Sequence, residues 1–197
     1  MPEPEIDHAK QAIREKVWAR LAREGAAPPD VYGYIPDFVG AEQAAARLAE
    51  LDAWRQAHVI KANPDRAQLP VRIRALQEGK LLYMAVPRLA TLSVAVNQQG
   101  VRVGKGAGYS DIEVALLTEA ELIGPETTIV TTVHQLQVID DELPDTEHDF
   151  GVDVIVTPIA TIMCKPTRRL TEVIPDHLDS SMAKNIPSLD GHFPPTP

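Results

Sequence analysis

The sequence predicts an α/β fold in a single domain: a mostly parallel, doubly wound sheet of the Rossmann-like, three-layer kind, followed by a proline-rich C-terminal tail. Three observations lead to this prediction. Short apolar runs alternate with amphipathic helical patterns, which is typical of a parallel sheet with helices on its faces. The chain has 197 residues, 44% hydrophobic and 24% charged, as one globular domain does. A glycine-rich stretch near the middle lies where such sheets bind ligands.

Four segments have the spacing of amphipathic helices. Residues 6–23 carry apolar side chains mostly four positions apart, and residues 41–54 and 111–122 carry them three and four apart. The segment 70–79 ends at Gly79, a residue type that commonly caps the C-terminus of a helix. These helices alternate with apolar runs, as the predicted fold requires.

Five apolar or β-branched runs have the length of strands, namely residues 59–61, 81–86, 92–96, 127–133 and 152–158. Only five residues separate the second run from the third. A parallel crossover needs about a dozen residues or more. This join is therefore either an antiparallel turn or a place where a segment is missing, and we favour the missing segment.

The loop-like stretch 25–40 is rich in glycine and proline and contains three aromatic residues, Tyr32, Tyr34 and Phe38. These rings could stack on a flat ligand such as a pterin, or they could anchor the loop to the core. The sequence leaves both interpretations open.

The glycine-rich stretch is the strongest candidate for a phosphate site. Gly104, Gly106 and Gly108 lie between an apolar run and a helical pattern, so backbone amides can approach an anion at a helix N-terminus. Arg102 and Lys105 add two positive charges to the loop. Its spacing fits neither the G-x-x-x-x-G-K-[ST] nor the G-x-G-x-x-G motif.

Asp111 follows this loop, where its carboxylate could meet a divalent metal carried by a polyphosphate, or could simply stabilise the helix dipole. Ser110 and Glu113 have the spacing of a capping box, which predicts Ser110 as the N-cap of the helix. We therefore expect Ser110 and Glu113 to be structural.

The composition narrows the classes of partner. A formal net charge of −9 argues against general binding of nucleic acid, which depends on a basic surface. No apolar run approaches the 18 residues of a membrane span, and no apolar signal segment lies at the N-terminus. Cys164 is the only cysteine, so no intrachain disulfide can form, and we expect a cytoplasmic protein.

The C-terminal part has a different composition from the rest. We expect residues 1–163 to form the α/β domain. Residues 164–197 contain six prolines, which predicts an extended tail packed on the body or on a partner subunit. Association of identical subunits through this tail would follow from the second arrangement. Arg168 and Arg169, at its start, are expected to lie on the surface.

Residues 102–111, RVGKGAGYSD, resemble the R-x-G-x-G-x-G-Y-Y-D motif of the 5-formyltetrahydrofolate cyclo-ligase, or methenyltetrahydrofolate synthetase, family. The loop is most similar to the branch of methenyltetrahydrofolate synthetase domain-containing proteins. Three further matches occur in the order in which the family has them, so the resemblance covers most of residues 8–160. They are the pair Lys10 and Arg14, the dipeptide Pro87-Arg88 and the stretch from Asp149 to Asp153.

The resemblance implies an ATP- and Mg²⁺-dependent enzyme that converts 5-formyltetrahydrofolate to 5,10-methenyltetrahydrofolate. The formyl oxygen would attack the γ-phosphate, and the second folate nitrogen would then close the ring and release phosphate. The implied roles are Tyr109 and Lys105 in catalysis; Lys10, Arg14, Arg102, Gly104, Lys105, Gly106, Gly108 and Asp111 in binding ATP; Asp111 and Asp149 in binding Mg²⁺; and Tyr109 and Gln135 in binding the folate.

Three features depart from the family pattern. Ser110 replaces the second tyrosine of the motif, Ile112 replaces an arginine that often follows the aspartate, and the family has a longer segment between Arg88 and Leu92 that helps to line the folate pocket. An alternative function is therefore a non-catalytic module of the same fold that binds a nucleotide or a folate. A further alternative is an interaction protein.

Overall fold

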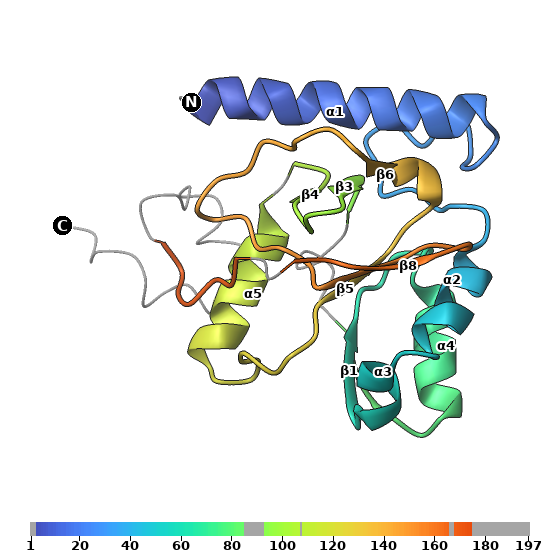
Figure 1. Ribbon diagram of the computed structural model, residues 1–197, viewed down its shortest axis with the longest axis vertical. Coiled ribbons are helices and arrows are strands. Elements are labelled where there is room, and N and C mark those ends of the chain that lie inside the picture. Colours follow the sequence, from blue (N-terminus) through green and yellow to red (C-terminus); the bar gives the residue numbers. More distant parts are fainter. Residues whose placement is uncertain (1–2, 85–92, 107, 166–167, 175–197) are drawn as a thin grey trace.

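The computed structural model describes residues 3–84, 93–106, 108–165 and 168–174 as a mixed α/β structure (Figure 1). Its helices are α1 (Glu3–Arg23), α2 (Ala41–Leu48), α3 (Asp52–Gln56), α4 (Leu69–Gln77) and α5 (Tyr109–Glu119), with a 3-10 turn, η1, at Gln135–Gln137. Its strands are β1 (Val59–Ala62), β2 (Leu81–Met84), β3 (Ala95–Asn97), β4 (Arg102–Val103), β5 (Val130–Thr132), β6 (Val138–Ile139), β7 (Val154–Val156) and β8 (Thr161–Met163).

The described strands form three small sheets, in the orders β1-β2, β4-β3-β6 and β5-β7-β8. The pairs β1–β2, β3–β6 and β5–β7 are parallel, whereas β3–β4 and β7–β8 are antiparallel. The α/β class is confirmed, but one mostly parallel, doubly wound sheet is not. The difference arises because β4 and β8 each follow a short turn and pair antiparallel with the preceding strand. The prediction had assumed parallel strands joined by longer crossovers.

Strand β7 lies between helices on both of its faces. Val154 and Val156 pack in a buried cluster with residues of α2 and α4, whereas Ile155 packs in a different cluster with residues of α5. The alternation follows from the two-residue period of a strand. Around β7 the structure therefore has the three-layer arrangement expected of the fold.

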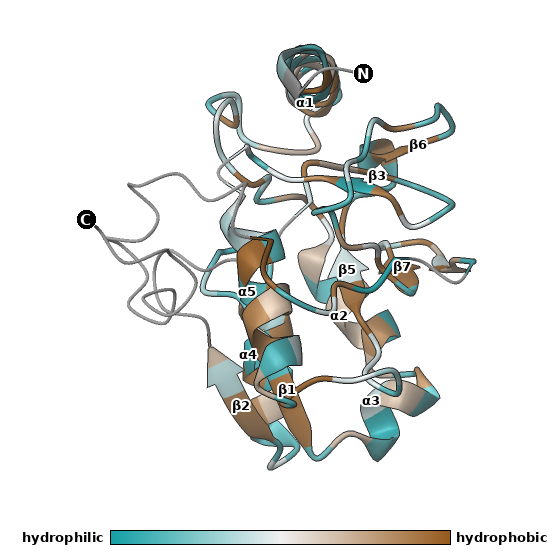
Figure 2. Ribbon diagram, turned by 90° about the vertical axis from the view of Figure 1, so that its left-hand side faces the viewer, coloured by the Kyte–Doolittle hydropathy of each residue, from teal (hydrophilic) through white to brown (hydrophobic). Residues whose placement is uncertain are grey.

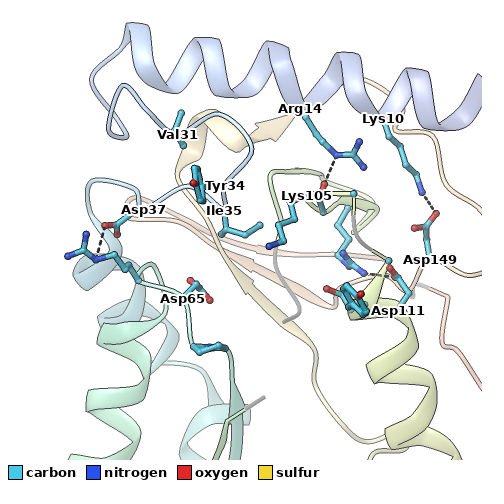
Figure 3. A pocket seen from close by; sticks show the side chains of 18 of the residues that line it. Lys10, Arg14, Val31, Tyr34, Ile35, Asp37, Asp65, Lys105, Asp111 and Asp149 are labelled. Carbon is cyan, nitrogen blue, oxygen red and sulfur yellow. Dashed lines mark hydrogen bonds and ion pairs between the residues drawn. The ribbon is translucent and has the colours of Figure 1, made fainter. Parts of the chain in front are cut away.

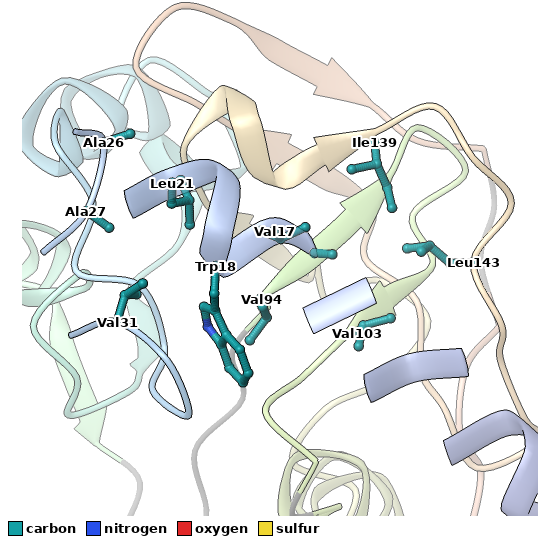
Figure 4. Packing of buried hydrophobic residues seen from close by; sticks show 11 residues of the cluster. Val17, Trp18, Leu21, Ala26, Ala27, Val31, Val94, Val103, Ile139 and Leu143 are labelled. Atoms are coloured by element: carbon teal, nitrogen blue, oxygen red, sulfur yellow. The ribbon is translucent and has the colours of Figure 1, made fainter. Parts of the chain in front are cut away.

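Helix α1 lies across the β4-β3-β6 sheet (Figure 1), and Figure 2 shows it end-on at the margin of the molecule. Val17, Trp18 and Leu21 point from α1 into a buried cluster that contains Val94, just before β3, and Val103 of β4 (Figure 4). This packing fixes α1 relative to the strand pair that leads into the glycine-rich loop.

The predicted helix 41–54 is two helices, α2 and α3, because Leu51 between them has an extended backbone conformation. The prediction for Gly79 is confirmed: it has a positive φ of 71° just after α4. The predicted capping box is wrong. Helix α5 begins at Tyr109, and its N-cap is Gly108 in the left-handed conformation, so Ser110 already lies inside the first turn.

Among the described residues, β2 and β3 belong to different sheets, so these two strands do not form the antiparallel hairpin that was one interpretation of the short join. The join itself, including Pro87-Arg88, lies outside the described residues. In the C-terminal part, Leu170 and Val173 are buried in the cluster around Phe150. The proposed boundary after residue 163 stays a prediction.

Within the described part of the chain, none of the helices combines the length and apolar character needed to cross a membrane.

Candidate active site

One cavity of about 770 Å³ gathers most of the residues that the sequence singles out (Figure 3). It lies between α1, the glycine-rich loop, the first turn of α5 and the loops that follow α1 and β1. Of the eleven predicted site residues, Gln135 does not line the cavity. The other ten do: Lys10, Arg14, Arg102, Gly104, Lys105, Gly106, Gly108, Tyr109, Asp111 and Asp149. Their placement is observed, whereas their binding and catalytic roles stay predictions.

Arg14 joins α1 to the glycine-rich loop. Its guanidinium donates from Nε to the carbonyl oxygen of Gly104 at 2.7 Å and packs against Gly106, where an added Cβ would lie 3.3 Å from Cζ. Only 7% of Arg14 is exposed. Burial lowers its pKa, an effect that the charges of Asp7 and Asp149 partly oppose. Because arginine remains protonated even so, a full positive charge is held beside the loop.

Lys10, one turn before Arg14 on α1, forms an ion pair with Asp149 in which Nζ lies 2.6 Å from Oδ2. The backbone amide and the hydroxyl of Thr146 donate to the same oxygen, at 2.6 and 2.9 Å. Burial alone would raise the pKa of Asp149, but Lys10 and these two donors together hold it below its ordinary value. Asp149 is therefore ionised and held in place.

Arg102 pairs with Asp111 at the start of α5. Its guanidinium also stacks on Phe150, with Cζ 3.9 Å from the ring centroid, and the amide of Phe150 donates to Asp111 Oδ1 at 3.3 Å. Burial raises the pKa of Asp111, Arg102 opposes this effect, and the charge of Asp149 raises it further. The two carboxylates thus interact with each other, so a cation placed between them would be stabilised.

The carboxylates have the donor atoms for such a cation. Among the described residues, every hydrogen bond and ion pair of Asp111 involves Oδ1 and every one of Asp149 involves Oδ2. One oxygen of each side chain therefore stays available. No group of three or more His, Cys, Asp or Glu side chains forms a metal site in the described segments. A Mg²⁺ ion would thus need phosphate oxygens and waters besides these two ligands, which is a common arrangement for that metal.

The glycine-rich loop follows the antiparallel hairpin of β3 and β4, not the longer strand that the sequence predicted before it. Gly106 has a φ of 105° and Gly108 one of 67°, a region that favours glycine. Gly108 ends the loop as the N-cap of α5, and Tyr109, Ser110 and Asp111 of the first turn line the cavity. The positive end of the α5 dipole therefore faces the cavity.

A second wall of the cavity is formed by Val31, Tyr34 and Ile35, together with Asp65 from the loop after β1. Of the three aromatic residues in the 25–40 loop, only Tyr34 lines the cavity. Phe38 is buried in the core, and the ring of Tyr32 lies beside that of Trp18. Asp65 was not among the site residues predicted from the sequence. Its position just after an apolar strand was the available signal, since strand ends are where such folds bind ligands.

Gln135 lies in η1, and its Oε1 is buried without a hydrogen-bond partner among the described residues. The preceding His134 caps this turn by accepting from the amide of Leu136 at 3.3 Å, which agrees with a structural rather than a catalytic histidine. The structure thus does not bring Gln135 to the cavity, because η1 packs against α1.

A model of the 5-formyltetrahydrofolate cyclo-ligase family matches the chain in two segments, residues 6–93 and 91–158. The chain belongs to this family. Both segments contain residues of the cavity, so the family match covers the glycine-rich loop together with Lys10, Arg14 and Asp149.

Curated relatives of this chain include methenyltetrahydrofolate synthase domain-containing proteins. The Mus musculus protein is 31% identical over 233 residues, which covers 92% of this chain and 62% of the relative. The Homo sapiens protein is 31% identical over 204 residues, which covers 78% of this chain and 53% of the relative. The chain thus spans roughly six-tenths or less of the length of these relatives.

Solved structures of the cyclo-ligase family share the fold. The NMR structure of Aquifex aeolicus 5,10-methenyltetrahydrofolate synthetase has a TM-score of 0.52 at 18% identity and covers 84% of this chain and 94% of its own. The Mycoplasma pneumoniae 5,10-methenyltetrahydrofolate synthetase has a TM-score of 0.51 at 12% identity and covers 76% of this chain and 98% of its own. At these identities the likeness supports the fold alone.

The comparison with the mouse protein also bears on the short join. The aligned region of 233 residues is longer than this whole chain of 197 residues, so the relative has internal residues that this sequence lacks. The two segments of the family match meet at residues 91–93, beside the join. The boundary between the two matched segments favours the join as the place of these missing residues.

Proposed function

We propose that this protein binds Mg-ATP and a reduced folate in the one cavity and converts 5-formyltetrahydrofolate to 5,10-methenyltetrahydrofolate. The observation that carries the proposal is the contact of Arg14 with the carbonyl of Gly104, because it brings the basic pair of α1 onto the glycine-rich loop. Lys10 and Lys105 line the same cavity, so cations from two distant parts of the chain converge on one space.

These cations would neutralise the triphosphate, and the amides of the glycine-rich loop and the first turn of α5 would hold it by hydrogen bonds. Lys105 is the cation with the most freedom to follow the phosphate that is transferred, since no hydrogen bond or ion pair holds it among the described residues. Positioning and charge neutralisation are the main contributions a protein makes to phosphoryl transfer.

Asp111 and Asp149 would present one oxygen each to Mg²⁺. A Mg²⁺ ion held by these two carboxylates would supply positive charge against the phosphate oxygens. Arg102 orients Asp111 through Oδ1, and Lys10 with Thr146 orients Asp149 through Oδ2. The side chains are thus arranged before any ligand arrives, which lowers the cost of binding.

The folate would occupy the wall formed by Val31, Tyr34 and Ile35, where a flat heterocycle can stack on apolar and aromatic side chains. Tyr109 lines the same cavity from the start of α5, where it would contact the formyl group and the γ-phosphate as they react. Gln135 does not line the cavity, and its contact with the folate stays a prediction.

A second candidate is a non-catalytic module that binds the nucleotide or the folate. A missing segment beside residues 91–93 would favour this candidate, because the family resemblance assigns part of the folate pocket to that segment. The basic residues, the glycine-rich loop and both aspartates would be kept in such a module.

A paired assay separates the two candidates. For an enzyme, absorbance of the methenyl product rises only when ATP, Mg²⁺ and 5-formyltetrahydrofolate are present together. For a binding module, ATP or the folate raises the melting temperature while no product forms. If no product forms and no ligand shifts the melting temperature, both candidates are contradicted.

The metal role is tested by Asp111→Asn, which keeps an acceptor for the amide of Phe150 but removes the charge. We expect Mg-ATP binding to weaken by about tenfold or more, equivalent to about 1.4 kcal/mol or more. Asp141→Asn is the control, because its pair with Lys16 is exposed and lies outside the cavity. Circular dichroism confirms folding of both variants. Unchanged Mg-ATP affinity in Asp111→Asn would exclude Asp111 from the metal site.

A further inference from the structure

The turn that carries Asp149 contacts both halves of the proposed metal site. Asp149 supplies one carboxylate, and the amide of the next residue, Phe150, donates to the other carboxylate, Asp111. The Phe150 ring also supports the guanidinium of Arg102. A displacement of this turn would therefore move three groups of the site at once.

Two sets of contacts hold this turn, one to α1 on the cavity side and one within the turn itself. Lys10 pairs with Asp149, and Thr146 donates to the same carboxylate oxygen while its carbonyl accepts from the Asp149 amide at 3.1 Å. In the proposed function, however, Lys10 also binds phosphate. With a nucleotide bound, the position of Asp149 would depend on Thr146 and on whatever holds Thr146.

Arg168, which does not line the cavity, holds Thr146. Its Nη1 donates to the carbonyl oxygen of Thr146, and the guanidinium pairs with Asp145 at 3.2 Å. Its own carbonyl oxygen accepts from the amide of Gly151 at 3.1 Å. Arg168 thus contacts the turn near both ends, although the sequence predicted only a surface arginine.

The neighbours of Arg168 fix it to the body. Arg169 donates to Asp153 at 2.6 Å and to the carbonyl of Thr127 at 2.9 Å. Leu170 and Val173 are buried in the cluster that contains Phe150. Arg168 therefore acts from a packed segment, and this segment lies beyond residue 158, where the family match ends.

We propose that Arg168 is a positioning residue that clamps the turn from Thr146 to Gly151 and so holds Asp149 toward Asp111 for Mg²⁺. This inference rests on the proposed function for the metal, and it adds a determinant of metal binding that the matched family region does not contain. Residues that orient metal ligands typically change metal affinity by about 10–100-fold when removed. Arg168 is about half exposed, so we expect the lower end of that range.

The test compares Arg168→Ala with Arg169→Ala, which removes a neighbouring arginine that bonds Asp153 and Thr127 instead of the turn. ATP affinity is measured with and without Mg²⁺. We expect Arg168→Ala to raise the Mg²⁺ concentration needed for tight ATP binding about tenfold while metal-free ATP affinity stays unchanged. Arg169→Ala should keep the Mg²⁺ dependence of the wild type, and Arg168→Lys should recover part of it.

Amide hydrogen exchange, read without any ligand, tests the clamp separately. The amides of Thr146, Asp149 and Phe150 should exchange faster in Arg168→Ala than in the wild type or in Arg169→Ala. Equal exchange, or the same Mg²⁺ dependence in both alanine variants, overturns the inference while the proposed function stands. A wild-type protein that does not bind Mg-ATP overturns the proposed function and the metal part of this inference together, and the exchange data then decide on the clamp alone.

Discussion

Asp65 provides a stability test that is independent of any ligand. Its carboxylate lies in the wall of the cavity, where Oδ1 accepts from the amide of Gln68 at 3.1 Å and Oδ2 is buried without a hydrogen-bond partner among the described residues. Burial raises the pKa of Asp65 to about 6, against the lowering effects of nearby backbone amides and of Arg72. Holding this group charged at neutral pH therefore costs folding free energy.

The size of this cost follows from the pKa. A rise from 3.8 to about 6 is roughly two units, and at about 1.4 kcal/mol per unit the cost is at most about 3 kcal/mol. Asp65→Asn keeps an oxygen for the Gln68 amide and removes the charge. We expect the variant to be more stable than the wild type by about 1–3 kcal/mol at pH 8, which is about 2–12 °C in melting temperature for a chain of this size.

The sign of the pH dependence is fixed by linkage. Because the folded-state pKa is the higher one, the native wild type binds more protons than the unfolded chain between about pH 4 and pH 6, and its stability falls as the pH rises through that range. The advantage of Asp65→Asn should thus be absent at pH 4 and complete above pH 6.

The assay is urea unfolding of the wild type, Asp65→Asn and Asp37→Asn at pH 4 and pH 8. Asp37 lines the same cavity, but its contact with Arg66 is a loose and exposed one of 3.9 Å, so its variant controls for the chemical change alone. Two results would refute the reasoning: no gain for Asp65→Asn at pH 8, or an equal gain at both pH values.

Two further predictions concern the loop and the core. Gly106→Ala should lower the free energy of unfolding by about 1–2 kcal/mol and weaken ATP binding, because its φ is 105° and the new Cβ would press on Arg14. Gly79→Ala is the control, because its φ of 71° is also positive but the space around it is open. It should lower the free energy of unfolding by a similar amount and leave ATP affinity unchanged. Equal ATP affinity in both variants would count against the role of the loop. Leu21→Ala should lower the unfolding free energy by about 2–5 kcal/mol because Leu21 is fully buried, whereas Leu122→Ala at an exposed position should change it by less than about 0.5 kcal/mol in urea unfolding.

The helices were predictable because their patterns are long. The apolar spacing from Ile6 to Leu21 spans several turns and coincides with α1, and Gly79 marks the end of α4 as its type suggests. The strands were harder. β4 and β6 have two residues each, too short for any periodic pattern, and their pairing depends on tertiary contacts. The three small sheets could not be inferred from such segments.

The residues gathered in the cavity were predictable mainly through the resemblance, because Lys10 and Arg14 are far in sequence from the glycine-rich loop. Spacing alone indicates only that they share a helix face. The polar support was not predictable. The amides of Phe150 and Thr146 contribute hydrogen bonds that any non-proline residue could make, and Arg168 reaches its partner across 22 positions of sequence.

The start of α5 shows how a local motif can mislead. Ser110 and Glu113 satisfy the capping-box spacing, yet Gly108 in the left-handed conformation begins the helix two residues earlier. Glu113 instead accepts from Lys61 of β1 at 2.5 Å. A long-range ion pair thus took the side chain that the local pattern reserved for the helix end.

The two-sided burial of β7 has a consequence for the reliability of assembly. If β7 paired one position out of step, Ile155 would be driven into the alanine-rich space beside α2, and the smaller valines would leave voids beside α5. Misalignment is thus penalised twice, by crowding in one layer and by emptiness in the other. The turn that bears Asp149 leads into this strand a few residues later. The register of β7 therefore also fixes the position of the Asp149 carboxylate relative to the sheet.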